Sequence, residues 1–108
     1  MLHRELARFI NIVVPELHPR WVLVFGSMAQ GQINEWSDLD IVVVMETELR
    51  FLDRIRLIQR RVRPRVAMDV LVYTPDEWTE ISKTRPFVRN EIAAKGRVVY
   101  DASSTALV

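Results

Sequence analysis

FGSMAQGQINEWSDLDIVVV, residues 25–44, joins two apolar segments through a polar connection. Residues 21–25 are a continuous apolar run that contains β-branched and aromatic residues, which is typical of a strand covered on both faces, and residues 39–45 predict a second buried strand. Residues 31–37 contain turn formers and have no periodicity, so they predict a loop. The stretch therefore predicts two buried strands with a Gly-Ser pair after the first and an Asp-x-Asp pair at the start of the second.

Helical periodicity precedes and follows this stretch. The first apolar stripe consists of Leu6, Phe9, Ile10, Val13, Val14 and Leu17. It predicts a helix that stops near Val14, because Pro15 lacks a backbone N–H. A second helix is expected to begin near Thr47 as its N-cap and to end at Pro64. Its core stripe is Phe51, Ile55, Ile58 and Val62, with Arg50, Arg54 and Arg61 off the stripe.

The rest of the chain predicts a third strand over residues 66–73 and two more helices. Residues 74–77, TPDE, form a capping box that begins one helix. Pro86 is expected to open the last helix and Gly96 to end it in the C′ position. Residues 97–100 then predict an edge strand, and residues 101–108 a loose tail. This order indicates one two-layer α/β (α+β) domain over residues 1–108, with parallel strands around the helix at 48–62.

The composition is that of a globular protein, with 49% hydrophobic and 27% charged residues. The absence of cysteine excludes disulfides and thiolate zinc sites, and leaves oxygen-binding cations as the plausible metals. No apolar run is long enough to span a membrane, and the N-terminus lacks a signal-peptide pattern, so a cytoplasmic location is expected.

Positive charge is concentrated in residues 50–65, which hold seven arginines and one acid, Asp53. Since the whole chain carries +1, this segment carries +6 and the remainder −5. The favoured interpretation is a solvated helix face. RNA binding is an alternative, although Phe51 is the only aromatic residue in the block.

Three aspartates indicate a metal site. Asp38 and Asp40 are two residues apart, so they project to the same face at the start of a strand. Asp69 interrupts an apolar strand, where burial of an unpaired carboxylate is costly. If these strands are adjacent, opposed side chains lie roughly 5 Å apart at Cβ, and three carboxylates could share metal. Two ions about 3.5–4 Å apart could then support phosphoryl or nucleotidyl transfer. Capping of a turn by Asp38 and pairing of Asp69 with a buried arginine are the structural alternatives.

The Gly-Ser pair is suited to an anion. Gly26 permits close approach of the backbone, and Ser27 begins a segment whose free N–H groups can face phosphates. A P-loop is excluded because GSMAQG lacks the Lys-Ser/Thr pair, and no G-x-G-x-x-G fingerprint is present.

Together, Gly-Ser, a loop of small residues and Ser-Asp-x-Asp resemble the signature of the DNA polymerase beta-type nucleotidyltransferase superfamily, and the size and spacing are most similar to its minimal members. The resemblance spans residues 21–73 and implies a mixed central sheet with helices packed on it. It implies that Asp38 and Asp40 bind Mg²⁺, as two ions, and that Asp69 completes the site and helps to activate the acceptor. The nucleotide-binding residues it implies are Gly26, Ser27, Gln30 and Ser37. Gln30 stands where the family commonly has Arg; it can still donate hydrogen bonds.

The implied activity is transfer of a nucleoside monophosphate, AMP from ATP, to an acceptor hydroxyl. With no second domain to bind the acceptor, we expect a partner protein to carry it. The resemblance suggests a small helical HEPN toxin, with this chain as the antitoxin of the pair. The alternative is a weakly catalytic binding module that neutralises its partner by contact, through the arginine-rich helix or residues 77–88. The intact acids favour the enzyme, and Gln30 favours the module.

Overall fold

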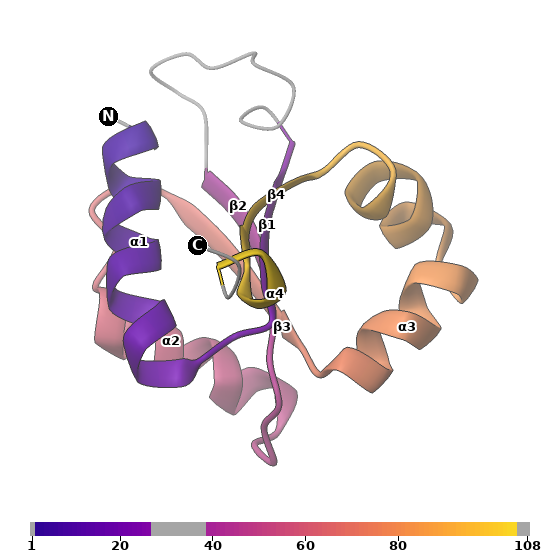
Figure 1. Cartoon of the computed structure of the whole chain (residues 1–108), viewed down its shortest axis with the longest axis horizontal. Helices are drawn as coiled ribbons and strands as arrows, with labels where there is room; N and C mark the ends of the chain where they lie inside the picture. Colours follow the sequence, from indigo (N-terminus) through magenta and orange to yellow (C-terminus); the bar gives the residue numbers. More distant parts are fainter. Residues whose placement is uncertain (1, 27–38, 106–108) are drawn as a thin grey trace.

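The computed structural model describes residues 2–26 and 39–105, which form a four-stranded mixed sheet with helices packed on it (Figure 1). The elements in chain order are α1 (Leu2–Leu17), β1 (Trp21–Phe25), β2 (Leu39–Val44), α2 (Phe51–Val62), β3 (Met68–Tyr73), α3 (Pro75–Thr84), the π-helix η1 (Val88–Ala93), β4 (Arg97–Asp101) and α4 (Ala102–Thr105). The predicted α+β class and mixed sheet are confirmed.

The strand order in the sheet is β3-β2-β1-β4. β2 pairs in parallel with β3, as the helical connection between them predicted, and antiparallel with β1. β4 returns from the C-terminal part of the chain to pair antiparallel with β1. β3 and β4 are therefore the edges of the sheet, and the predicted edge strand at residues 97–100 is confirmed.

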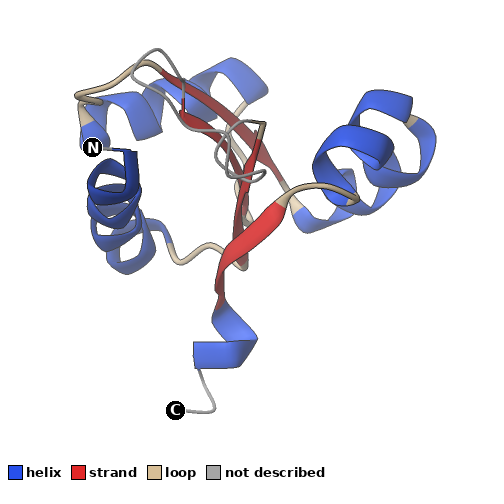
Figure 2. Cartoon of the chain, turned by 90° about the horizontal axis from the view of Figure 1, so that it is seen from above, coloured by secondary structure: helices blue, strands red, loops and turns tan. Residues whose placement is uncertain are grey.

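Each face of the sheet has its own core. Leu39, Ile41 and Val43 of β2 pack in the core that contains the apolar stripes of α1 and α2, whereas Val42 and Val44 pack in the core under η1 and α3. This explains why residues 41–44 of β2 are all apolar, because both faces of the strand are covered there. Viewed from above, α1 and α2 lie on one side of the sheet and α3 and η1 on the other (Figure 2). The structure thus adds a second helical layer to the predicted one.

The predicted end of the first helix at Val14 is wrong. α1 continues through Pro15 to Leu17, and His18, whose φ is 50°, follows it. The amide of His18 donates a hydrogen bond to the carbonyl of Val14 at 3.0 Å, which closes the last turn. Leu17 packs against the core between the sheet and the helices α1 and α2. Burial of this apolar stripe outweighs the hydrogen bond that proline cannot make.

The second helix begins later than Thr47. Arg50 is its N-cap, without a side-chain capping bond, and the Thr47 hydroxyl accepts a hydrogen bond from the amide of Leu49 at 3.1 Å in the preceding turn. Ile58 and Val62 of the predicted stripe are buried, but Phe51 is 38% exposed. Arg54, which was expected off the stripe, is buried.

The C-terminal half contains one confirmed motif and several differences. Thr74 and Glu77 form the predicted capping box at the start of α3. The third strand begins at Met68, two residues later than expected, and the last helix is a short π-helix. Gly96 lacks the left-handed conformation of a C′ residue; a Cβ there would collide with the carbonyl of Ile92, so the position requires glycine for close packing. The expected loose tail includes a helical turn, α4.

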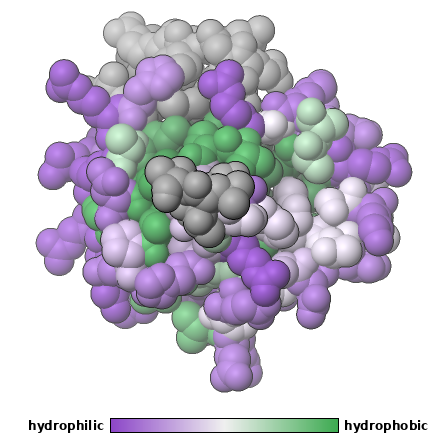
Figure 3. Space-filling model, viewed as in Figure 1, coloured by the Kyte–Doolittle hydropathy of each residue, from purple (hydrophilic) through white to green (hydrophobic). Residues whose placement is uncertain are grey.

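The molecular surface is hydrophilic around its outline, and hydrophobic residues gather near the centre of the face in view (Figure 3). Within residues 2–26 and 39–105, no helix has both the length and the apolar character needed to cross a membrane.

Candidate functional site

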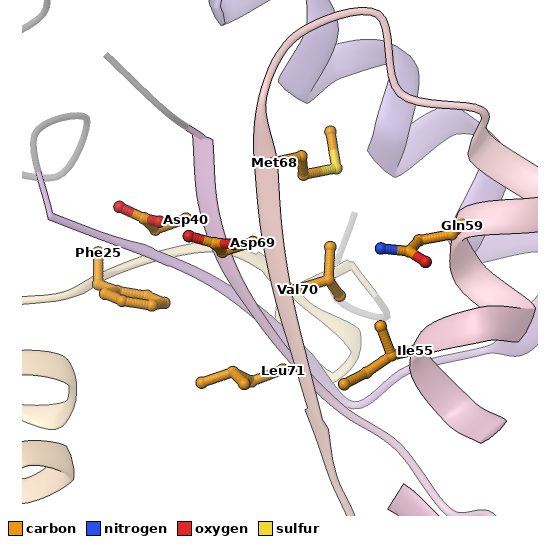
Figure 4. Close-up of a pocket in the computed structure, with 8 residues that line it drawn as sticks. All are labelled: Phe25, Asp40, Ile55, Gln59, Met68, Asp69, Val70 and Leu71. Carbon is orange, nitrogen blue, oxygen red and sulfur yellow. The ribbon is translucent and has the colours of Figure 1, made fainter. Parts of the chain in front are cut away.

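Asp40 and Asp69 occupy the second positions of β2 and β3 and are direct partners in the parallel register of these strands. Their side chains point to the same side of the sheet (Figure 4). The expectation that adjacent strands bring these two acids together is therefore confirmed. Two carboxylates held opposite each other repel, and this arrangement favours a bound cation.

A cavity of about 400 Å³ contains both carboxylates. It is lined by Phe25, Asp40, Ile55, Gln59, Met68, Asp69, Val70 and Leu71. Because β3 is an edge strand, residues from both of its faces reach the cavity, and α2 provides the outer wall (Figure 4). The acids therefore lie at an open border of the sheet, where a second molecule can approach.

Asp69 is exposed and Asp40 is partly exposed. The sequence-based argument that Asp69 would be buried in an apolar strand is wrong, since the burial of β3 begins at Val70. The cost of burying a lone carboxylate consequently does not apply here. Because Asp69 is exposed, a ligand can reach its carboxylate oxygens directly.

Gly26 directly follows β1 and lies beside Asp40. Its φ of 69° is a left-handed conformation, and a Cβ atom at this position would lie 2.5 Å from Oδ2 of Asp40. The strand register explains this contact, because Phe25 is the direct partner of Asp40. Glycine is required here both for its conformation and for the space that the carboxylate occupies.

The other predicted site residues, Ser27, Gln30, Ser37 and Asp38, lie outside the described residues. In the part of the chain that the structure describes, no group of three acids or histidines could hold a metal ion, and Asp40 and Asp69 form a pair. The chemistry of this pair fits a hard divalent cation, which prefers carboxylate oxygens and tolerates additional ligands.

A buried arginine that the sequence reasoning placed on the solvated face holds β3 in position. Arg54 forms an ion pair with Glu77 at 2.6 Å, from Nη1 to Oε1. It also donates hydrogen bonds to the carbonyl oxygens of Leu49 at 2.8 Å and Val72 at 3.2 Å. The Arg54 guanidinium holds the pKa of Glu77 below its ordinary value.

This cluster connects α2, β3 and the capping box of α3. β3 is also the strand that carries Asp69. The spacing of residues in the sequence indicates the burial of Arg54, because Arg54 lies four residues before Ile58 and eight before Val62, which are both buried. Charge alone had suggested the opposite placement.

Comparisons with known proteins agree with this fold. Residues 8–105 match the family model described as "Polymerase beta, Nucleotidyltransferase". A solved structure from Sulfolobus solfataricus, classed as a nucleotidyltransferase, superposes with a TM-score of 0.66 at 21% identity, over 94% of this chain and 85% of that one. A search of curated protein sequences gave no match.

Two further solved structures contain toxin–antitoxin proteins. One, determined with AMP-PNP, has a TM-score of 0.58 at 17% identity and covers 94% of this chain and 75% of that one. The other, a mutant of the toxin–antitoxin MntA-HpeT, has a TM-score of 0.52 at 19% identity and covers 95% of this chain and 75% of that one. At these identities the similarity concerns the fold.

Proposed function

Because the chain belongs to the polymerase beta nucleotidyltransferase family, we propose that it transfers AMP from ATP to a hydroxyl group of a partner protein. The observation that carries the proposal is the direct pairing of Asp40 with Asp69 in an open cavity beside Gly26. A carboxylate pair that water and ligands can reach suits phosphoryl chemistry, in which positioning and charge neutralisation supply most of the rate acceleration.

In this proposal Asp40 and Asp69, together with Asp38, hold Mg²⁺ as two ions, which neutralise charge on the phosphates when bound. Asp69 accepts the proton of the acceptor hydroxyl. The acceptor oxygen forms a bond to the α-phosphorus, the bond from that phosphorus to the bridging oxygen breaks, and pyrophosphate leaves. Asp69 suits this role because it lies on the edge strand, at the exposed side of the cavity.

In this proposal the nucleotide lies on the side of Asp40 and Asp69 where Gly26 is. Gly26 and Ser27 present backbone to the triphosphate, and Gln30 and Ser37 donate hydrogen bonds to the nucleotide. The left-handed conformation of Gly26 supports this assignment, because it turns the chain at the end of β1 without placing a side chain on Asp40.

We assign the acceptor hydroxyl to a partner protein. The toxin–antitoxin neighbours support a two-protein system. We assign the partner as a small helical toxin of the HEPN type, with this chain as the antitoxin that adenylylates it.

The test is the intact mass of the protein that copurifies with this chain, before and after incubation with ATP and Mg²⁺. We expect a gain of one adenylyl group with the wild-type chain and none with Asp40→Asn. Asp76→Asn is the matched control, because it removes an exposed carboxylate from the start of α3, away from the cavity. A stable complex without any mass gain would instead support neutralisation of the partner by contact.

A further inference from the structure

A basic groove lies on α2 next to the cavity of the acids. It has a volume of about 580 Å³ and is lined by Arg56, Gln59, Arg60 and Arg63. Gln59 also lines the cavity that contains Asp40 and Asp69. The two hollows therefore share a wall residue, and an extended ligand in the groove can continue past Gln59 into the cavity of the acids.

The guanidinium groups of the groove keep most of their hydrogen-bonding capacity. Arg60 and Arg63 have no ion pair with any acid of the described residues. Arg56 contacts Asp53 at 3.2 Å, but both side chains are largely exposed, 65% and 49%, so this pair contributes little. The groove is consequently a cationic surface that an anionic group can occupy without displacing a buried partner.

Arg63 is held in place by its backbone. It has a φ of 49° at the end of α2, its amide donates to the carbonyl of Gln59 at 2.9 Å, and its carbonyl accepts from Nη2 of Arg8 at 3.1 Å. The nearby end of α2 is fixed by the same arginine, which donates to the carbonyl of Val62 at 2.8 Å. The wall of the groove is therefore anchored to α1, and its side chains remain available.

The groove and Gly26 lie on opposite sides of the acids. Gly26 follows β1, β2 carries Asp40 and the edge strand β3 carries Asp69. α2 packs on the face of the sheet opposite to the two acids, and its Gln59 lines the cavity beside the edge of β3 (Figure 4). A triphosphate beside Gly26 and a segment that runs from the groove past the edge of β3 would thus meet at the carboxylates. This is the arrangement that transfer between two substrates requires.

We propose that Arg56, Arg60 and Arg63 bind an acidic segment of the protein acceptor and so bring its hydroxyl to Asp69. This inference rests on the proposed function, whose acceptor it describes further. Arginine suits carboxylates because its planar group donates two parallel hydrogen bonds. The groove lining contains no aromatic residue on which bases could stack, so an acidic protein segment fits better than nucleic acid.

The experiment measures binding without requiring transfer. The wild-type chain is titrated separately with a fluorescent oligo-glutamate peptide, a single-stranded RNA of equal length and a fluorescent ATP analogue, at low and high salt. We expect Arg56→Ala/Arg60→Ala to weaken peptide binding about tenfold or more and to leave binding of the nucleotide unchanged. Arg50→Ala/Arg61→Ala is the matched control, because it removes the same charge from the same region outside the groove, and it should keep most of the affinity.

Equal losses in the two double variants, tighter binding of the RNA than of the peptide, or loss of nucleotide binding would each overturn the proposal. With the active chain and its copurified partner, the groove variant should raise the KM for the partner protein and leave the KM for ATP unchanged. If peptide binding follows the expectation while no partner gains an adenylyl group, the groove stands and the proposed transfer fails.

Discussion

Gly26 and Asp40 are in direct contact, such that a Cβ atom on the glycine would lie 2.5 Å from Oδ2 of the aspartate. The contact joins the end of β1 to the start of β2, and it connects a backbone requirement with a proposed ligand of the metal. A side chain at position 26 would have to displace the carboxylate or change the backbone.

We therefore expect Gly26→Ala to impair activity more than folding. The left-handed φ and the collision should cost about 1–3 kcal/mol of unfolding free energy. Displacement of Asp40 should reduce the transfer rate about a hundredfold, as misplacement of a catalytic group by about 1 Å does. Urea denaturation and the rate of adenylyl transfer, measured on the same preparation, provide the comparison.

Gly96→Ala is the control for this variant. A Cβ there meets the carbonyl of Ile92 and no carboxylate, so stability should fall while the transfer rate per folded molecule is retained. Equal losses of activity in the two variants would show that strain alone explains the effect at Gly26.

The pairing of Asp40 with Asp69 predicts opposite effects on stability with and without metal. In the presence of a chelator, Asp69→Asn should raise the unfolding free energy by about 0.2–1 kcal/mol, because like charges on opposed strand positions destabilise a sheet. Mg²⁺ should then stabilise the wild-type chain and have a smaller effect on the variant. Thermal unfolding of both proteins, with and without Mg²⁺, checks this; an Asp69→Asn chain less stable than wild type in chelator would contradict it.

Arg54→Met should destabilise the fold by about 2–4 kcal/mol. The substitution leaves Glu77 without its ion pair and the carbonyl oxygens of Leu49 and Val72 without their donor. Arg61→Met on the same helix removes only an exposed pair with Glu16, so we expect a change within about 0.5 kcal/mol. Chemical denaturation of the two variants distinguishes a structural arginine from a surface one.

The contacts of Glu5 predict that the packing of α1 against the turn after α2 loses stability in acid. It is buried, pairs with Arg8 at 2.7 Å and accepts a hydrogen bond from the amide of Arg65 at 2.6 Å. The hydrogen bond from Arg8 lowers the pKa of Glu5 from 4.5 to about 2. Because the folded pKa is the lower one, the stabilisation is complete above pH 4.5 and is lost as the pH falls towards 2.

Unfolding free energies measured across this pH range should therefore decline in the wild-type chain, and Glu5→Gln should remove about 2–4 kcal/mol of that decline. Glu16→Gln, an exposed carboxylate on the same helix, should retain it. A decline of equal size in Glu5→Gln and wild type would assign the acid sensitivity to other groups.

The sequence predicted the elements whose signals are local. The capping box of Thr74 and Glu77 depends on residues three apart, and the apolar runs of β1 and β2 follow from burial on both faces. The predictions failed where distant packing decides. Pro15 stays helical because Val13 before it is buried and Leu17 after it packs against the same core. The hydroxyl of Thr47 accepts a hydrogen bond within the turn that precedes α2, so it does not cap the helix.

The same distinction holds for the site. Adjacency of Asp40 and Asp69 followed from the strand order, but the exposure of Asp69 depends on where the helices stop covering β3, which no local pattern specifies. Arg54 was misplaced because its partner Glu77 lies 23 residues away in sequence. A charge count could not separate this arginine from its exposed neighbours.

The return of β4 to β1 has a consequence for biosynthesis. Until residues 97–101 have emerged from the ribosome, β1 lacks its second neighbour and presents an open row of backbone hydrogen-bonding groups. Such an edge can recruit another growing chain. A nascent chain of this protein thus remains vulnerable to intermolecular strand pairing until nearly the whole domain has been translated, and prompt engagement of a chaperone or a cognate partner would protect it.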